Sequence, residues 1–147
     1  MGMRYLIPLL LLAFNANAET TLEIGQGWAS GDPGNATVII GERNDKYGIS
    51  MGWIEKHWVQ ADGKNHELGP NMFVDIQRHW QYKKFEFSLG PAYFQNTNRA
   101  LAKNFNFSAA LKYNINEDVS IVVRHWSNAG SGAYNMGHDF IGIGFRF

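Results

Sequence analysis

Apolar side chains recur at every second position along most of this chain, which constrains its fold more than any other feature. Successive side chains of a β-strand point to opposite faces, so a period of two is the period of a half-buried strand. Clusters of turn-forming residues interrupt the alternation after roughly ten residues each time. The pattern predicts eight strands, at residues 21–29, 36–43, 47–59, 72–82, 85–95, 104–115, 119–127 and 138–147.

The two faces of these strands differ in chemistry. One face is apolar and aromatic: it includes Phe85, Phe87, Leu89, Pro91, Tyr93, Phe105, Phe107, Ala109, Leu111, Tyr113, Met72, Val74, Ile76, Trp80, Ile141, Ile143, Phe145 and Phe147. The other is small or charged: it includes Glu23, Gly25, Gly27, Asp75, Gln77, Glu86, Ser88, Ser108, Lys112, Arg124, Gly142, Gly144 and Arg146. An eight-stranded barrel encloses only enough space for side chains, and charges of both signs inside it must pair. We therefore expect an all-β, eight-stranded antiparallel up-and-down transmembrane β-barrel whose apolar face contacts lipid, and Arg124 to pair with an interior carboxylate.

A soluble lipocalin-like barrel is the alternative fold. It would turn the apolar face inward around a ligand and leave the charged face in water. The crowding of Phe, Tyr and Trp on neighbouring strands leaves little lumen for such a ligand, so the outer-membrane barrel is favoured.

The first eighteen residues differ from the rest. Arg4 precedes an apolar run that is too short to span a membrane, and Ala16-Asn17-Ala18 has the small residues of a cleavage site. We expect residues 1–18 to be a secretory signal peptide and residues 19–147 to form the barrel and carry the catalytic residues. The chain has 13 basic and 13 acidic residues and no cysteine, so it shows no sign of nucleic-acid binding and cannot be held by disulfides.

The connections between strands alternate between short and long ones. In outer-membrane barrels short turns lie on the periplasmic side and longer loops outside, so residues 119–127 end at the cell exterior. His125 and Ser127 share the parity of the outward apolar residues there, and Asp139 shares the parity of Ile141 on the next strand. A serine becomes a nucleophile beside a base that a carboxylate orients, so these three residues are the candidate triad.

The residues that follow Ser127 suit an oxyanion hole. Asn128 and Gly130 open a glycine-rich loop whose amide side chain and backbone N–H groups could stabilise the oxyanion of a tetrahedral intermediate. No metal-ligand motif is present in the sequence. Lys56, Lys64, Arg99 and Lys103 lie near the predicted outer loops, where they could attract phosphates.

The sequences HWSNAG at 125–130 and NMGHD at 135–139, together with the terminal Phe147 and LGPAYF at 89–94, resemble the lipid A deacylases of the PagL type. The resemblance implies an outer-membrane esterase that removes the ester-linked hydroxyacyl chain from position 3 of lipid A, without a metal or organic cofactor. It implies His125 as base, Ser127 as nucleophile, and Asn128 and Gly130 at the oxyanion. The family pattern has glutamate where this chain has Asp139, which is one methylene shorter.

Lipid A, or lipopolysaccharide, is then the expected substrate, and outer-membrane lipid the surroundings. Two other functions remain open: a non-catalytic small barrel for adhesion or membrane integrity, and an outer-membrane phospholipid esterase. A homodimer is left open as the oligomeric state.

Overall fold

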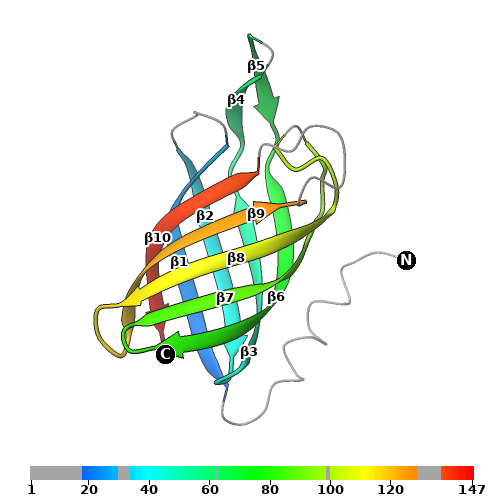
Figure 1. Ribbon diagram of the computed structural model, residues 1–147. Coiled ribbons are helices and arrows are strands. Elements are labelled where there is room, and N and C mark those ends of the chain that lie inside the picture. The colour runs from blue at the N-terminus through cyan, green and yellow to red at the C-terminus, as the bar shows by residue number, and fades with distance from the viewer. Residues whose placement is uncertain (1–17, 30–33, 62, 99, 129–136) are drawn as a thin grey trace.

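The computed structural model describes residues 18–29, 34–61, 63–98, 100–128 and 137–147. Eight of its strands form one barrel: β1 (Glu19–Trp28), β2 (Asn35–Arg43), β3 (Tyr47–Ile54), β6 (Asn71–Tyr82), β7 (Phe85–Phe94), β8 (Phe105–Asn114), β9 (Val119–Ser127) and β10 (His138–Arg146). Two further strands, β4 (His57–Ala61) and β5 (Lys64–Leu68), form a separate hairpin (Figure 1). The predicted signal peptide falls almost entirely outside these residues. Within them, no helix is long and apolar enough to cross a membrane.

The barrel closes by antiparallel pairing of its first and last strands. β1 pairs with β2 on one side and with β10 on the other, and every neighbouring pair around the barrel is antiparallel. Closure gives each of the eight barrel strands that the structure describes a neighbour on both sides, which is a requirement for a sheet that sits in lipid. The up-and-down, eight-stranded barrel predicted from the alternation is confirmed.

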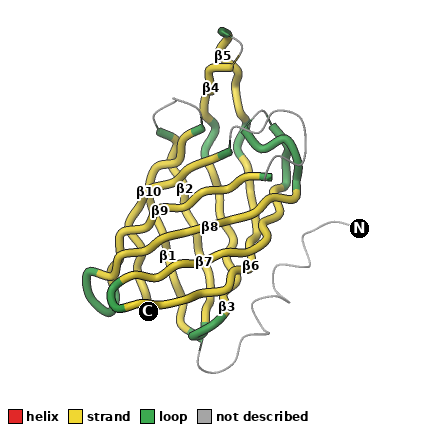
Figure 2. Tube along the Cα trace, in the orientation of Figure 1, coloured by secondary structure: helices red, strands yellow, loops and turns green. Residues whose placement is uncertain are grey.

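The third predicted strand, residues 47–59, was wrong in its second half. β3 ends at Ile54, and residues 57–61 pair instead with residues 64–68, which the sequence pattern left in a loop. Figures 1 and 2 show this hairpin projecting beyond the end of the barrel where the longer connections lie. Gly63 at its tip has φ +69°, a conformation that suits glycine in a tight hairpin turn.

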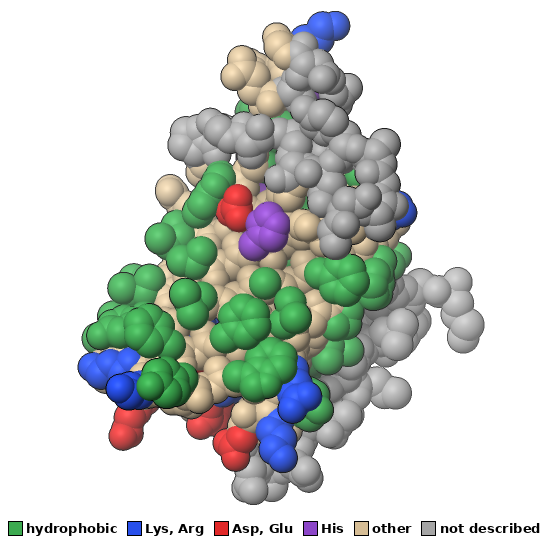
Figure 3. Space-filling model, viewed as in Figure 1, with side chains coloured by type: hydrophobic (Ala, Val, Ile, Leu, Met, Phe, Trp, Pro, Cys, Tyr) green, Lys and Arg blue, Asp and Glu red, His purple; other side chains and the backbone are tan. Residues whose placement is uncertain are grey.

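The outer wall of the barrel is apolar. The side chains that cover it are exposed in this structure: they include Ile76, Phe87, Leu89, Phe107, Leu111, Ile121, Val123, Ile141 and Ile143. Figure 3 shows apolar side chains across the middle of one face and charged ones gathered at its lower rim. The predicted outward direction of the apolar face is confirmed, and the lipocalin-like alternative is wrong.

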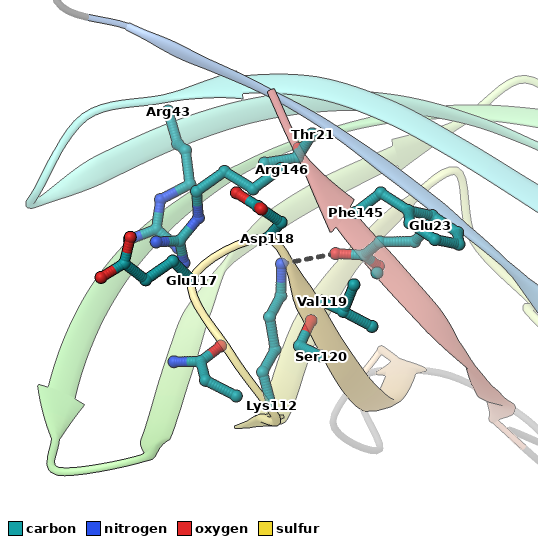
Figure 4. A pocket seen from close by; sticks show the side chains of 12 residues that line it. Thr21, Glu23, Arg43, Lys112, Glu117, Asp118, Val119, Ser120, Phe145 and Arg146 are labelled. Atoms are coloured by element: carbon teal, nitrogen blue, oxygen red, sulfur yellow. Dashed lines mark ion pairs between the residues drawn. The ribbon is translucent and has the colours of Figure 1, made fainter.

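The lower half of the interior is a network of buried charges. Arg124 donates to Glu23 at 3.0 and 2.9 Å and to Asp75 at 2.8 Å, and Lys112 lies 2.6 Å from Glu23. Ser108 donates to Asp75 at 3.2 Å. Each buried charge has a partner of opposite sign, as burial requires, and the expected pairing of Arg124 is confirmed. Figure 4 shows Lys112 reaching Glu23 beside a small pocket at the lower end.

The upper half of the interior is an apolar and aromatic core. Trp126, fully buried, packs edge-on against Phe73 with ring centroids 4.9 Å apart and lies 6.4 Å from Phe140. The base of the β4–β5 hairpin completes this core with Val59 and Leu68, both buried. Strand β9 therefore crosses both the charged layer and the aromatic layer of the interior.

Candidate active site

The pairing of β9 with β10 places two titratable residues directly opposite each other. His125 is the cross-strand partner of Asp139, just as Val123 is the partner of Ile141 one step further down. Because side chains alternate along a strand, all four share the outer face. The site therefore lies on the wall of the barrel, above a row of exposed apolar side chains.

A hydrogen bond joins these two residues. His125 Nδ1 lies 2.8 Å from Asp139 Oδ1, and the side chains are 50% and 37% exposed respectively. A carboxylate only accepts hydrogen bonds, so this contact favours the tautomer of the imidazole that carries its hydrogen on Nδ1 and leaves a lone pair on Nε2. The shorter side chain of aspartate is thus long enough to orient the imidazole.

Ser127 is the last residue of β9 and lies two positions beyond His125 on the same face. Residues at this spacing have backbones roughly 6 to 7 Å apart, so two side chains that lean together can meet. Ser127 is half-buried, and its cross-strand partner on β8 is Phe107. The strand order therefore brings an imidazole, a hydroxyl and a carboxylate to one patch of the outer wall.

On the side of His125 away from Asp139, the neighbouring strand β8 carries a small residue. On β8 the cross-strand partner of His125 is Ala109, between the bulkier Phe107 and Leu111 on the same face. Side chains directly opposite each other in antiparallel strands have Cβ atoms about 5 Å apart. Ala109 therefore leaves space beside the imidazole that a longer side chain would fill.

Asn128 and Gly130 are the two candidate oxyanion residues. Asn128 follows β9 and is only 1% exposed, so its side chain is buried and does not lie on the outer wall. Gly130 lies outside the described residues. An oxyanion contribution from Asn128 would consequently come from its backbone N–H.

The basic residues expected near the outer loops have varied surroundings. Lys56, at the base of the hairpin, pairs with Glu67 at 2.9 Å, and Lys64 near the hairpin tip is exposed. Lys103 is exposed next to β8, whereas Arg99 lies outside the described residues. Across the described ranges, no three His, Asp or Glu side chains gather in a group that could hold a metal ion.

A cluster of buried rings lies behind the site and was not predicted from the sequence. His138, the neighbour of Asp139, is buried with its ring centroid 5.3 Å from that of His57 and 5.8 Å from that of Trp126. These two histidines are 81 positions apart in the chain (138 minus 57), and they meet because His57 lies at the base of the hairpin, next to the end of the barrel where β10 begins. No local spacing could have predicted the contact.

Residues 34–147, most of the chain, match the family model described as "Lipid A 3-O-deacylase (PagL)". The chain belongs to this family. Members of the lipid A 3-O-deacylase family are hydrolases, and membership places this barrel in the outer membrane. Its exposed apolar wall is then the surface that contacts lipid. Lipid A of lipopolysaccharide is the substrate that membership implies.

The fold has a solved counterpart. The "Crystal structure of the outer membrane enzyme PagL" superposes with a TM-score of 0.54 at 13% sequence identity, covering 88% of this chain and 98% of that chain. At this identity the likeness is one of fold. No curated protein sequence matches the chain.

Proposed function

We propose that this protein hydrolyses the ester that links the hydroxyacyl chain to position 3 of lipid A, using Ser127, His125 and Asp139. The observation that carries the proposal is the hydrogen bond between His125 Nδ1 and Asp139 Oδ1 on the lipid-facing wall, with Ser127 two residues along the same face. Polar side chains on the lipid-facing wall destabilise a barrel, so their presence in this position indicates a function. A substrate whose ester lies at the membrane surface could reach them directly.

The reaction follows in two steps. Ser127 Oγ attacks the ester carbonyl while His125 Nε2 takes its proton, and the imidazolium then gives that proton to the departing 3-hydroxyl oxygen of lipid A. A water molecule next attacks the acyl-serine, again losing a proton to His125, and the hydroxy fatty acid leaves as Ser127 recovers its proton. Asp139 stays ionised throughout and stabilises the imidazolium.

The oxyanion of each tetrahedral intermediate needs hydrogen-bond donors. We assign this role to backbone N–H groups at Asn128 and Gly130, at the start of the loop that follows Ser127. Donors of this kind, fixed before the reaction, are typically the largest single source of transition-state stabilisation.

The proposed position in the membrane follows from the connections. The site lies at the end of the barrel that carries the longer connections, and in barrels of this class that end faces the cell exterior. The triad would therefore meet the outer leaflet, where lipid A resides.

We expect residues 1–18 to be removed as a signal peptide during export, with cleavage after Ala18. N-terminal sequencing of the protein from outer membranes checks that cleavage.

The function is tested with purified, folded protein in detergent micelles, supplied in turn with lipopolysaccharide and with phospholipid. Mass spectrometry identifies the acids released by the wild type, by Ser127→Ala and by a matched control, Ser120→Ala, on the same strand but facing the interior. We expect a 3-hydroxy fatty acid from lipopolysaccharide with the wild type and the control, and none with Ser127→Ala.

Each alternative predicts a different result. Release from phospholipid but not from lipopolysaccharide would make the protein a phospholipid esterase. No release from either lipid by a folded wild type would favour the non-catalytic barrel. Full activity of Ser127→Ala on lipopolysaccharide would reject the proposed triad, but it would still support lipid A as the substrate.

A further inference from the structure

The imidazole of His125 is confined on a second side, away from Asp139. A Cβ atom added to Gly137 would lie 2.6 Å from His125 Cε1 and 3.3 Å from His125 Nε2. The bare Cα of Gly137 therefore lies against the edge of the ring that must accept the proton of Ser127. Nδ1, Cε1 and Nε2 are consecutive atoms of the ring, so the bond from Asp139 and the contact with Gly137 constrain adjacent positions.

We propose that Gly137 is a positioning residue for the reaction: it limits the rotation of His125 and at the same time keeps the region beside Nε2 clear. The inference rests on the proposed function, because it concerns the base of that reaction. The bond to Cβ and the hydrogen bond from Nδ1 to Asp139 hold one side of the ring, and rotation about the side-chain bonds can still shift the opposite Cε1–Nε2 edge. Contact along the Cε1–Nε2 edge removes this freedom.

A side chain at this position would displace the base. Non-bonded carbon atoms pack at about 3.5 to 4 Å, so a Cβ 2.6 Å from Cε1 would force the ring to move by about 1 Å. Misplacement of a reacting group by that amount can lower the rate about a hundredfold. We expect binding of lipid A to change little, because Gly137 is buried.

Gly137 is itself held in place by the backbone of a distant loop. Its N–H donates to the carbonyl of Ala100 at 3.1 Å. Ala100 is fully buried, and its own N–H donates to Asn98 Oδ1 at 2.9 Å. Asn98 Oδ1 also accepts from the N–H of Leu101, at 2.8 Å, so one side chain holds the backbone of both Ala100 and Leu101. This backbone hydrogen bond ties Gly137 to a buried residue of another connection, which supports its role as a stop for the imidazole.

A second explanation for this glycine concerns its backbone. Gly137 has φ +72°, a region that side-chain-bearing residues adopt at a cost. The chain offers a matched control, since Gly63 has φ +69° and a Cβ there would meet nothing within 4 Å. Gly63→Ala thus introduces the same backbone strain without a steric contact. Gly137→Asn gives the opposite separation, because asparagine tolerates positive φ but still carries a Cβ.

The experiment compares Gly137→Ala, Gly137→Asn and Gly63→Ala with the wild type. Folding is followed by the heat-dependent shift in electrophoretic mobility of the barrel. The enzyme readouts are kcat and KM on lipopolysaccharide and the rate at which a fluorophosphonate probe labels the serine, which requires an oriented base but no lipid A. We expect both Gly137 variants to fold, to lose about a hundredfold in kcat and in labelling rate, and to keep KM within about twofold. Gly63→Ala should match the wild type.

Three results would overturn the proposal: wild-type kcat in Gly137→Asn, a loss confined to KM, or barrels that fail to fold with both substitutions. The first would assign the glycine a backbone role only, and the third would assign it a role in folding rather than in positioning the base. Failure of the proposed function is distinguishable from these, because it would appear as an inactive wild type or an active Ser127→Ala.

Discussion

Arg124 and His125 are neighbours in the chain, and they face opposite sides of the barrel wall. Arg124 is 2% exposed and bound to Glu23 and Asp75 in the interior, whereas the His125 side chain is 50% exposed on the lipid side. Shifting a strand by one residue exchanges its two faces. The interior ion pairs of Arg124 therefore resist a shift that would carry His125 inside.

Removing the guanidinium should destabilise the barrel. Arg124→Ala leaves Glu23 and Asp75 buried without this partner, and breaking a buried ion pair from one side costs about 3 to 5 kcal/mol. Urea unfolding in lipid vesicles measures the change, with the exposed Lys83→Ala as the control. Equal unfolding midpoints for the two variants would show that the network does not stabilise the fold.

The role of Asp139 can be separated from its size. Asp139→Asn keeps the shape of the side chain but can donate a hydrogen to Nδ1, which favours the imidazole tautomer that cannot accept a proton at Nε2. We expect kcat to fall by about two to four orders of magnitude.

Asp139→Glu restores the residue of the family pattern and should keep activity within about tenfold of the wild type, since the carboxylate remains. Steady-state kinetics on lipopolysaccharide measure both substitutions. An Asp139→Asn variant as active as Asp139→Glu would show that no charge is needed at this position.

The space beside the imidazole predicts a steric effect. Ala109→Phe places a large ring opposite His125 on the adjacent strand, where it would crowd the base and the approach of the ester. We expect kcat/KM to fall at least tenfold, as measured by release of the hydroxy fatty acid. Leu111→Phe, one pair further down and opposite Val123, is the control and should have little effect. Similar losses in the two variants would point to a general change in the lipid-facing surface.

The alternation of side chains was enough to predict which face each residue occupies. Parity alone placed Arg124 inside and His125 and Asp139 outside, because the period of a strand leaves only two choices for each side chain. Exact opposition of His125 and Asp139 was beyond it, since register depends on hydrogen bonding between strands and on the length of the loop that joins them.

Two other features depend on the folded chain as a whole. The β4–β5 hairpin was missed because Val59 continues the odd-numbered apolar positions of the preceding strand after the polar residues 55–57. Those polar residues are the one local signal of the break, and the change of pairing partner itself depends on residues further along the chain. The contact between Gly137 and His125 joins a residue with no side chain to one twelve positions earlier (137 minus 125). A sequence pattern built from side chains could not reveal that contact.

Chemical labelling of the activated serine tests most directly whether His125 activates Ser127 as the nucleophile. The folded protein is treated with a fluorophosphonate probe, digested and analysed by mass spectrometry, in the wild type and in His125→Ala. We predict a single adduct, on Ser127, that forms at least a hundredfold more slowly without His125. An adduct on another serine, or one on Ser127 that forms equally fast in His125→Ala, would contradict it.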